Sequence, residues 1–495
     1  MTTLRRTPIV SASFTLWLAL TLLFLVLMVV PRAASAAGDP SPAAGHWEGA
    51  ITLPPGDLQV LVDLVHDAAG WSGTIDIPMQ SAKGLPLEDV TVQDGKVRFK
   101  IRGIPGEPTF DGTLTASGKP EIAGNFTQGG ATLPFHLGRD AVAMPVRRQQ
   151  PKPPFPYTSE EVTYTNGDVK LAGTLTLPPG DGPFPAVVLI TGSGAQDRDE
   201  TILGHKPFLI LADHLSRHGI AVLRADDRGV GGSTGSVSKS TTADFAADAM
   251  AGLHLLSQHP KIAKDRIGLL GHSEGAVAAP LAASRSRDVA FVVMLAGTGV
   301  PGPDVLLLQI ERISRADGAT EESIKKELAA TKRTIDAVLG EKDPQAREAK
   351  VRETAKEIAA ALMPDELRKE GGVDSFVNKT VSQMGSPWAY FFVNYDPRPA
   401  LRKVTVPVLA LNGEKDLQVI ADQNLPEIER ALKEAGNRDV TIVRLPGLNH
   451  LFQPDAKTGS PSEYMQNETT LAPIVLDTVT DWINNRFGLA KATAR

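Results

Sequence analysis

The stretch L-G-H-S-E-G at residues 270–275 contains the pentapeptide G-x-S-x-G, and the same pattern recurs at residues 231–235. In a chain of 495 residues with 45 glycines, a pattern this short arises by chance in about one sequence of four. At most one copy is expected to carry chemistry. The surrounding sequence must therefore decide between Ser273 and Ser233.

The first copy lies between a strand pattern and a helix pattern. Residues 266–270 form a largely apolar run, and an alanine-rich segment over residues 275–283 follows the serine. A strand, a tight turn and a helix in this order expose the serine, and the glycines are needed for a strained backbone and close packing. Ser233 lies in G-V-G-G-S-T-G, past its strand and before a Ser/Thr-rich loop, so we expect it to be structural.

Outward from the first copy, continuous apolar runs alternate with amphipathic patterns. This alternation predicts an α/β domain over residues 159–490, with a doubly wound, mostly parallel sheet covered by helices on both faces. Strands are expected at residues 161–165, 169–177, 186–190, 220–223, 266–270, 289–295, 406–411 and 440–445. Helices are expected at residues 207–218, 243–259, 275–283, 426–435 and 471–487.

A helical, charge-rich insertion over residues 301–398 interrupts this alternation. Its apolar residues recur at helical spacing with lysine and glutamate between them, which is typical of helices with a solvated face. The insertion follows one sheet strand and precedes another, near the C-terminal end of the sheet. We interpret it as a helical lid over a ligand site.

The region before the α/β domain has a different pattern of apolar residues. Residues 45–140 contain short alternating segments separated by Gly, Pro or Asp-Gly turns, which predicts a small antiparallel β-domain, either a sheet or a barrel. Trp47 and Trp71 are expected in its core rather than in a ligand site. Residues 141–158 are proline-rich and polar, which predicts a semi-rigid linker.

The N-terminus and the composition bear on the compartment and on the partners. Residues 1–36 contain two arginines, an apolar run over residues 14–30 and an A-x-A site, in the order of a secretory signal peptide. The alternative is an uncleaved membrane anchor; in both cases the protein is expected to be exported, to the periplasm or beyond the cell.

The net charge of −6 and the lack of a basic run argue against a nucleic-acid partner. Membrane contact is expected only through an uncleaved N-terminal segment. The chain has no cysteine, which excludes disulfides and thiolate catalysis.

A serine hydroxyl needs a base and an orienting acid to become a nucleophile. Asp416 follows the expected strand 406–411, and His450 follows the next expected strand, so both would lie at the C-terminal edge of the sheet with Ser273. Glu414 and Asp422 are the alternative acids on the same loop. His214 and His218 lie four residues apart on a helix, but no acidic ligand accompanies them, so no metal site is expected.

The oxyanion of an acyl-transfer intermediate needs backbone N–H donors. One is expected from Glu274, the residue after the serine. The other is expected from the glycine-rich loop 191–200, with Ser193 as the first candidate and Gly194 as the second.

These segments together resemble the α/β-hydrolase superfamily. More narrowly, they resemble exported bacterial carboxylesterases that carry T-G-S-G-x-Q-D-R-D-E, G-H-S-E-G, L-N-G-x-x-D-x-Q-V and N-H-L-F-Q, here residues 191–200, 271–275, 411–419 and 449–453. Residues 386–388 and 395–397 resemble the segment that closes the lid in these esterases. The resemblance covers residues 160–488, and residues 45–140 resemble a β-domain that often precedes such esterases.

The resemblance implies hydrolysis of small-molecule carboxylic esters with short to medium acyl chains, through an acyl-enzyme on Ser273 and without a cofactor. Two other functions remain open: a serine peptidase of the prolyl-oligopeptidase type, and a non-catalytic binding protein on a hydrolase scaffold. Peptidases of that type usually carry a large β-propeller, which some 100 residues of β-structure cannot form. The sequence does not define the oligomeric state.

Overall fold

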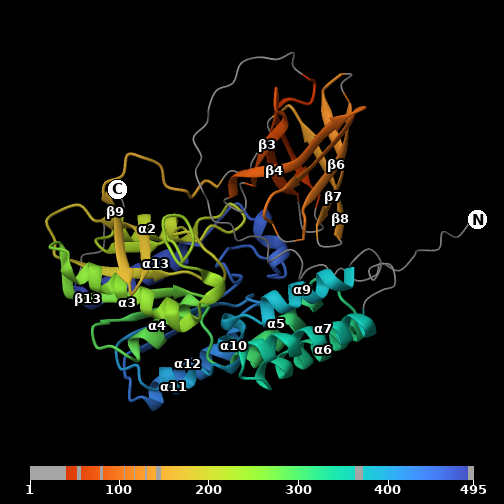
Figure 1. Ribbon diagram of the computed structural model, residues 1–495. Helices are drawn as coiled ribbons and strands as arrows, with labels where there is room; N and C mark the ends of the chain where they lie inside the picture. Colours follow the sequence, from red (N-terminus) through yellow and green to blue (C-terminus); the bar gives the residue numbers. More distant parts are fainter. Residues whose placement is uncertain are drawn as a thin grey trace, which may run out of the picture.

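The computed structural model describes residues 41–488, apart from 53–56, 78–81, 105, 116–117, 129–130, 141–146 and 363–371. It contains a barrel, a mixed sheet layered with helices, and a group of lid helices beside the sheet (Figure 1). The predicted signal peptide lies outside the described residues. Within them, no helix has the length and apolar character needed to cross a membrane.

The hydrolase sheet has eight strands in the order β16-β15-β14-β13-β11-β12-β10-β9. Neighbouring strands run parallel except for β10, which is antiparallel to both β9 and β12. The strands are β9 Thr158–Asn166, β10 Val169–Leu177, β11 Phe184–Ile190, β12 Ala221–Ala225, β13 Ile262–His272, β14 Val292–Leu295, β15 Val408–Gly413 and β16 Val440–Leu445. This topology confirms the predicted doubly wound, mostly parallel sheet.

Two hydrophobic cores explain why the central strands are apolar on both faces. One core joins the sheet to α3, α4 and α12, and the other joins it to α2 and α13. These helices are α2 Pro207–Arg217, α3 Thr242–Gln258, α4 Gly275–Ala283, α12 Ala421–Glu434 and α13 Pro473–Phe487. Helix α12 begins five residues before the predicted start at residue 426, with Pro426 inside it. Pro426 is the sixth residue of α12 and has no N–H to donate to the carbonyl of Asp422, so the helix lacks one internal hydrogen bond there.

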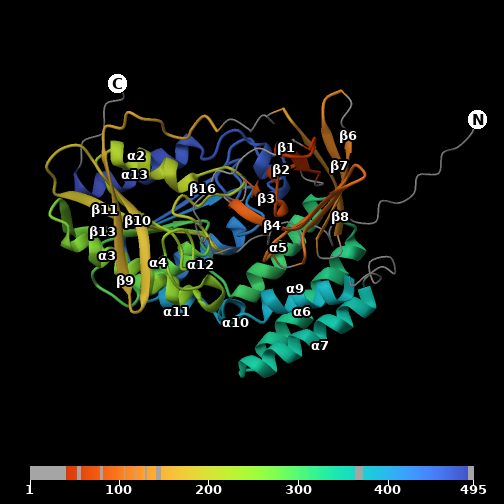
Figure 2. The ribbon, with the colours of Figure 1, turned by 45° about the horizontal axis from the view of Figure 1, so that its top comes forward.

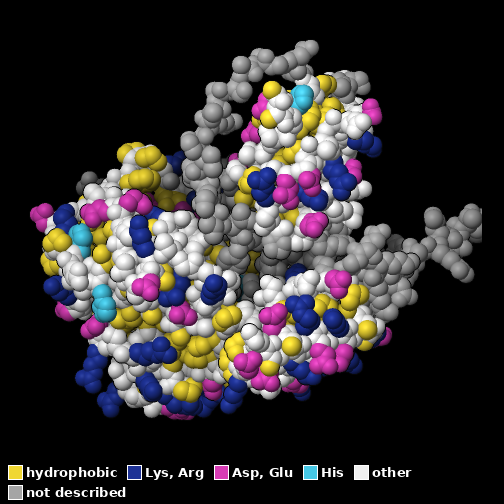
Figure 3. Space-filling view, in the orientation of Figure 1, with side chains coloured by type: hydrophobic (Ala, Val, Ile, Leu, Met, Phe, Trp, Pro, Cys, Tyr) yellow, Lys and Arg dark blue, Asp and Glu magenta, His cyan; other side chains and the backbone are white. Residues whose placement is uncertain are grey.

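The lid helices lie between β14 and β15 in the sequence, where a helical insertion was predicted. They are α5 Gly302–Ala316, α6 Glu321–Leu339, α7 Pro344–Leu362, α9 Gly372–Met384, α10 Pro387–Asn394 and α11 Arg398–Leu401. They share a small core of their own, to which Val338 and Val351 contribute fully buried side chains. Lysine, arginine and acidic side chains are spread over the face of these helices that Figure 3 shows, with hydrophobic side chains between them, as expected for helices with a solvated face.

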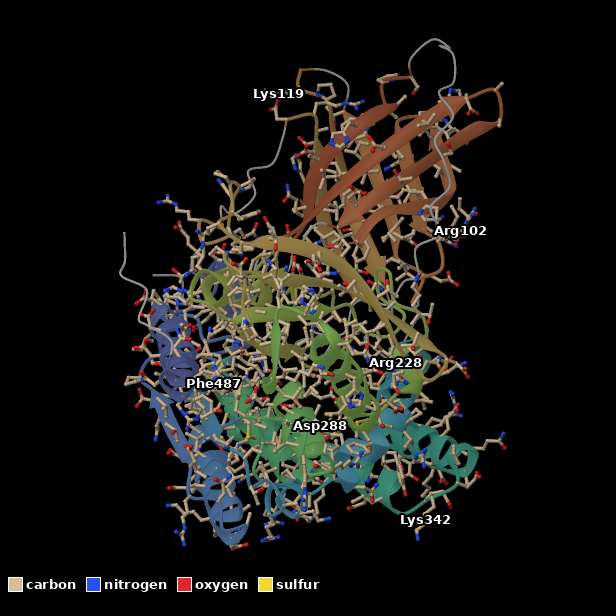
Figure 4. The ribbon with its side chains drawn as sticks, turned by 90° about the vertical axis from the view of Figure 1, so that its left-hand side faces the viewer. Arg102, Lys119, Arg228, Asp288, Lys342 and Phe487 are labelled. Atoms are coloured by element: carbon tan, nitrogen blue, oxygen red, sulfur yellow. The ribbon has the colours of Figure 1, made fainter. Side chains whose placement is uncertain are left out.

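The N-terminal domain is a closed antiparallel barrel of eight strands. These are β1 Gly45–Ile51, β2 Leu58–Asp67, β3 Gly70–Ile77, β4 Ala82–Gln93, β5 Lys96–Ile101, β6 Thr109–Thr115, β7 Glu121–Gln128 and β8 Ala131–Gly138. Trp47 is fully buried among the barrel's phenylalanines and donates its indole N–H to the Ala43 carbonyl over 2.8 Å. Trp71 is half-buried and stacks on His66. In Figure 4, Lys119 marks the barrel end far from the hydrolase sheet and Arg102 the nearer end.

Part of the predicted linker is bound to the hydrolase domain rather than acting as a spacer. Arg147 donates to the carbonyls of Leu203, Met465 and Asn467, and Gln149 accepts from the N–H groups of residues 470 and 471. Leu203 and Met465 also pack against the barrel core. The barrel therefore packs directly against the hydrolase domain at these two residues, and Figure 2 shows the two domains side by side.

Candidate active site

Ser273 occupies a sharp turn between β13 and α4. Its φ angle is +53°, a left-handed conformation that is strained for a residue other than glycine. A Cβ atom on Gly271 would lie 2.0 Å from the carbonyl carbon of Gly275, and one on Gly275 would lie 2.0 Å from the carbonyl oxygen of Ile190. Both glycines are therefore required by close backbone contacts, as expected for a strand–turn–helix that exposes a serine.

The structure brings Ser273, His450 and Asp416 together in one hydrogen-bonded chain. The Oγ of Ser273 lies 3.1 Å from Nε2 of His450, and Nδ1 of His450 lies 2.8 Å from Oδ2 of Asp416. Because a carboxylate accepts, Nδ1 carries the proton and Nε2 presents its lone pair to the serine. Asp416 is held in turn by the N–H groups of Gln418 and Val419, which both donate to Oδ1 over 2.8 Å.

The other two acids on the loop after β15 have different partners. Glu414 accepts from the N–H of Gly447, and Asp422 forms an ion pair with Arg444. Neither forms a hydrogen bond to His450. Asp416 and His450 are both almost fully buried, so their hydrogen bond is protected from water.

Several residues that fix the His450 loop were not singled out from the sequence. Asn449 accepts the N–H groups of Leu451 and Gln453 through its side-chain oxygen and donates to the Gln453 side chain. The Gln453 amide donates to the carbonyl of Tyr464, whose hydroxyl accepts from Gln418 on the Asp416 loop. The motif N-H-L-F-Q contained the first two of these residues, but nothing in the sequence indicated Tyr464.

The second pentapeptide forms a structural turn. The buried Oγ of Ser233 donates to the carbonyl of Asp226 over 2.8 Å and accepts from the N–H of Ala172 over 2.9 Å. Arg198 binds the Asp226 carboxylate through two nitrogen atoms. No histidine contacts Ser233 among the described residues, so its hydroxyl has no base to activate it.

Loop 191–200 lies beside the serine turn, but one of its N–H groups is already used. Gly192 donates its N–H to Oε1 of Glu200 over 2.7 Å. The N–H groups of Ser193, Gly194 and Glu274 have no acceptor in the part of the chain that the structure describes. Ser193 and Gly194 therefore both stay predicted donors beside Glu274.

The side chain of Glu274 connects the serine turn to the lid. Its Oε1 accepts from the Thr242 hydroxyl of α3 and from the Trp388 indole N–H of α10, each over 2.7 Å. Its Oε2 is buried without a hydrogen-bond partner among the described residues. Burial raises the pKa of Glu274 to about 7, although both hydrogen bonds act to lower it. The lid is thus bound directly to the residue that follows Ser273.

His214 and His218 lie at the end of α2, where their rings stack at 4.3 Å and Nδ1 of His218 contacts the carbonyl oxygen of His214. Within the described ranges, no group of three or more His, Asp or Glu side chains could hold a metal ion.

A serine at a strand–turn–helix, linked to a histidine and an aspartate from later strands of a mostly parallel sheet, is the arrangement of an α/β-hydrolase. The sequence model of the family described as "Serine aminopeptidase, S33" matches residues 207–456, which is half of the chain and includes all three residues. The chain belongs to this family.

Among curated proteins, Esterase EstD of Thermotoga maritima is 30% identical over 316 residues, which are 63% of this chain and 65% of that relative. The chain thus spans about 65% of the relative's length. Among solved structures, an esterase of Pyrococcus furiosus is 18% identical with a TM-score of 0.40, covering 67% of this chain and 91% of its own. Est1E of Butyrivibrio proteoclasticus with bound ferulic acid is 19% identical with a TM-score of 0.38, covering 66% and 100%.

Proposed function

We propose that this protein is a serine hydrolase that cleaves small-molecule carboxylic esters. The hydrogen-bonded chain from Ser273 through His450 to Asp416, at a strained turn beside free N–H groups, carries this proposal. The similarity to Esterase EstD supports ester rather than peptide substrates. No cofactor is needed, because the serine, its base and the oxyanion donors all come from the chain.

The proposed reaction has two acyl-transfer steps. Ser273 Oγ attacks the ester carbonyl as His450 takes its proton, and Asp416 stabilises the resulting imidazolium. The N–H of Glu274, with that of Ser193 or Gly194, holds the oxyanion. His450 then protonates the departing alcohol, which leaves an acyl-enzyme. Water attacks this ester by the same path, releasing the carboxylic acid and restoring the serine hydroxyl.

The position of the lid supports short to medium acyl chains. Trp388 in α10 contacts Glu274, so lid side chains lie directly next to the serine turn. We propose that Trp388 limits the length of the acyl chain that fits beside Ser273. We expect kcat/KM on p-nitrophenyl esters to be highest with acetate to octanoate and to fall with palmitate. A maximum with palmitate would contradict the acyl-chain preference and leave the reaction type intact.

The central test compares the two serines of the two pentapeptides. Ser273→Ala is expected to abolish hydrolysis of p-nitrophenyl butyrate and labelling by a fluorophosphonate probe, because the nucleophile is removed. Ser233→Ala is the matched control, with kcat within about twofold of wild type because Ser233 is structural. Near-wild-type turnover by Ser273→Ala would overturn the proposal.

The two other functions are separated by the same assays. The family's description names an aminopeptidase, so aminoacyl p-nitroanilides are tested beside the esters, and a higher kcat/KM on the anilides would favour peptide bonds. The N-terminal domain is a closed barrel rather than a propeller, which supports the ester function. A binding protein on a hydrolase scaffold would neither hydrolyse esters nor react with the probe.

We also propose that residues 1–36 direct export, on the order of charged, apolar and small residues in the sequence. N-terminal sequencing of the mature protein tests this proposal. A start near residue 37 supports a cleaved signal peptide, an intact N-terminus in the membrane fraction supports an anchor, and a cytoplasmic protein with Met1 would contradict export.

A further inference from the structure

A second histidine–carboxylate pair lies next to the Ser273–His450–Asp416 chain. Nδ1 of His272 is 2.9 Å from Oε1 of Glu200, and Nε2 of His272 is 3.0 Å from the backbone carbonyl oxygen of His450. Both side chains are buried, Glu200 at 1% exposure and His272 at 5%. The His272 and His450 rings lie 4.9 Å apart between centroids. This pair therefore contacts the proposed general base through its backbone.

The partners of His272 define how many protons its contacts need. A carbonyl oxygen only accepts, so Nε2 must carry one proton, and the contact with Glu200 needs a second. Burial acts to lower the pKa of His272, but the charge and hydrogen bond of Glu200, the carbonyl of His450 and the charge of Asp416 outweigh it and raise the pKa. The contacts at both ring nitrogens therefore favour the imidazolium form of His272, paired with the Glu200 carboxylate.

Glu200 extends the same contact to loop 191–200. Its Oε1 also accepts the N–H of Gly192, the residue directly before the candidate oxyanion donor Ser193. Glu200 itself has a φ angle of +52°, and its Oε2 has no partner among the described residues. A strained backbone that turns a buried carboxylate towards an active site is retained only where the surrounding structure holds it.

We propose that Glu200 and His272 are positioning residues, whose ion pair holds the oxyanion loop, the serine turn and the His450 loop in register. The proposal rests on the ester hydrolase function proposed above. Each of the three parts contributes one contact: the N–H of Gly192, the His272 ring that precedes Ser273, and the carbonyl of His450. The two side chains together contact all three parts.

We call the Glu200–His272 ion pair, with its contacts to Gly192 and His450, the bridge. A single substitution can remove the charge of Glu200 from it. In Glu200→Gln, the neutral amide no longer favours the imidazolium, so His272 keeps one ring proton. In the wild type, one atom, Oε1, contacts both Gly192 and His272. An amide oxygen at that position accepts from Gly192 but faces the lone pair of Nδ1, and an amide nitrogen there donates to Nδ1 but opposes the Gly192 N–H. One of the three contacts is therefore lost. The substitution changes few atoms, so its effect reports on the bridge rather than on packing.

We expect Glu200→Gln to lower kcat by about 10-fold to 100-fold, with KM within about twofold, because a small displacement of the base or oxyanion loop acts on the chemical step. The acid limb of the kcat/KM–pH profile should move to higher pH, because the positive charge lost from His272 lies beside the His450 ring, whereas the negative charge lost from Glu200 lies at the opposite ring nitrogen of His272. Asp248→Asn, which removes the charge of a buried carboxylate paired with Arg228 away from the site, is the control and should leave the profile unchanged.

Two substitutions of His272 test which of its two contacts, that with Glu200 or that with His450, matters more for kcat. An asparagine amide reaches the position of Nδ1 and can keep the Glu200 contact, whereas a glutamine amide reaches the position of Nε2 and can keep the contact with His450. We expect kcat of His272→Asn to be lower than that of His272→Gln by about fivefold or more. This comparison remains informative if Glu200→Gln does not fold.

Three results would overturn the bridge. They are wild-type kcat and an unshifted pH profile in Glu200→Gln, the same profile shift in Asp248→Asn, or equal kcat values for the two His272 variants. An inactive wild-type protein that also fails to react with the fluorophosphonate probe would instead contradict the ester hydrolase function.

Discussion

Ser273 and Ser233 occupy the same position in two copies of one pentapeptide, yet their hydroxyl groups have different partners. The Ser273 hydroxyl forms a hydrogen bond with Nε2 of His450, whereas the Ser233 hydroxyl forms hydrogen bonds with two backbone groups. The fourth position differs in the same way: Glu274 binds the lid, and the Thr234 hydroxyl accepts the N–H of Lys170 within the sheet region. The pattern is thus compatible with either role, and the elements around it decide which one is realised.

The largest expected effect concerns the acid, for which the second pentapeptide has no counterpart. Asp416→Asn should lower kcat on p-nitrophenyl butyrate by about 10⁴-fold, because the asparagine no longer fixes the histidine tautomer or stabilises its charge. Glu414→Gln and Asp422→Asn serve as controls on the same loop and should keep kcat within about threefold. A larger loss of kcat in either control than in Asp416→Asn would show that Asp416 is not the catalytic acid.

The next effect compares the last glycine of each copy. Gly275→Ala places a Cβ about 2.0 Å from the Ile190 carbonyl oxygen and should reduce the free energy of unfolding by about 3 kcal/mol or more. Ester hydrolysis should be lost with it. Gly235 has a φ angle of +93°, but a Cβ there would meet no atom closer than 3.4 Å, so Gly235→Ala should cost about 1–2 kcal/mol.

Urea unfolding measures the stability of both glycine variants, and nitrophenyl ester hydrolysis measures their activity. Equal losses in the two variants would show that close packing does not distinguish the two turns.

The smallest effect concerns the fourth position and depends on pH. Burial raises the pKa of Glu274 from its ordinary 4.5 to about 7, so the folded state binds a proton more tightly than the unfolded state does. Stability from this group is therefore present below pH 4.5 and falls as the pH rises to 7, by at most about 3 kcal/mol. Glu274→Gln removes this dependence, so its stability relative to wild type should rise between pH 5 and pH 8.

Urea unfolding at the two pH values measures this difference. Thr234→Ala is the matched variant in the second copy, and its loss of stability, about 1 kcal/mol, should be the same at both. A Glu274→Gln variant with a pH-independent difference from wild type would show that the carboxyl titrates in its ordinary range.

The fold was predictable where the signal is local. Continuous apolar runs defined the strands of the hydrolase sheet, and helical spacing defined the lid. The closure of the barrel was left open, because it depends on pairing between β1 and β8, for instance Gly49 with Leu137, and an alternating pattern carries no information about which distant strand is the partner.

The candidate site divides in the same manner. The sequence placed Ser273, Asp416 and His450 at the ends of their strands, and the structure brings their side chains within hydrogen-bonding distance. The roles of the Glu274 and Glu200 carboxylates could not be predicted from the sequence, since their partners Trp388 and His272 lie 114 and 72 residues away. Contacts of this kind follow from how helices and loops pack, and residue order alone does not contain that information.

The contacts of Arg147 and Gln149 have a mechanical consequence. They bind the end of the barrel's connection to residues 465–471, directly after Tyr464, which contacts side chains from both the Asp416 loop and the His450 loop. A force that pulls on the barrel is therefore carried into the segment behind the acid and the base. The barrel and the hydrolase domain are thus mechanically coupled through Arg147 and Gln149. A shortened protein keeps these contacts only if it begins before Arg147.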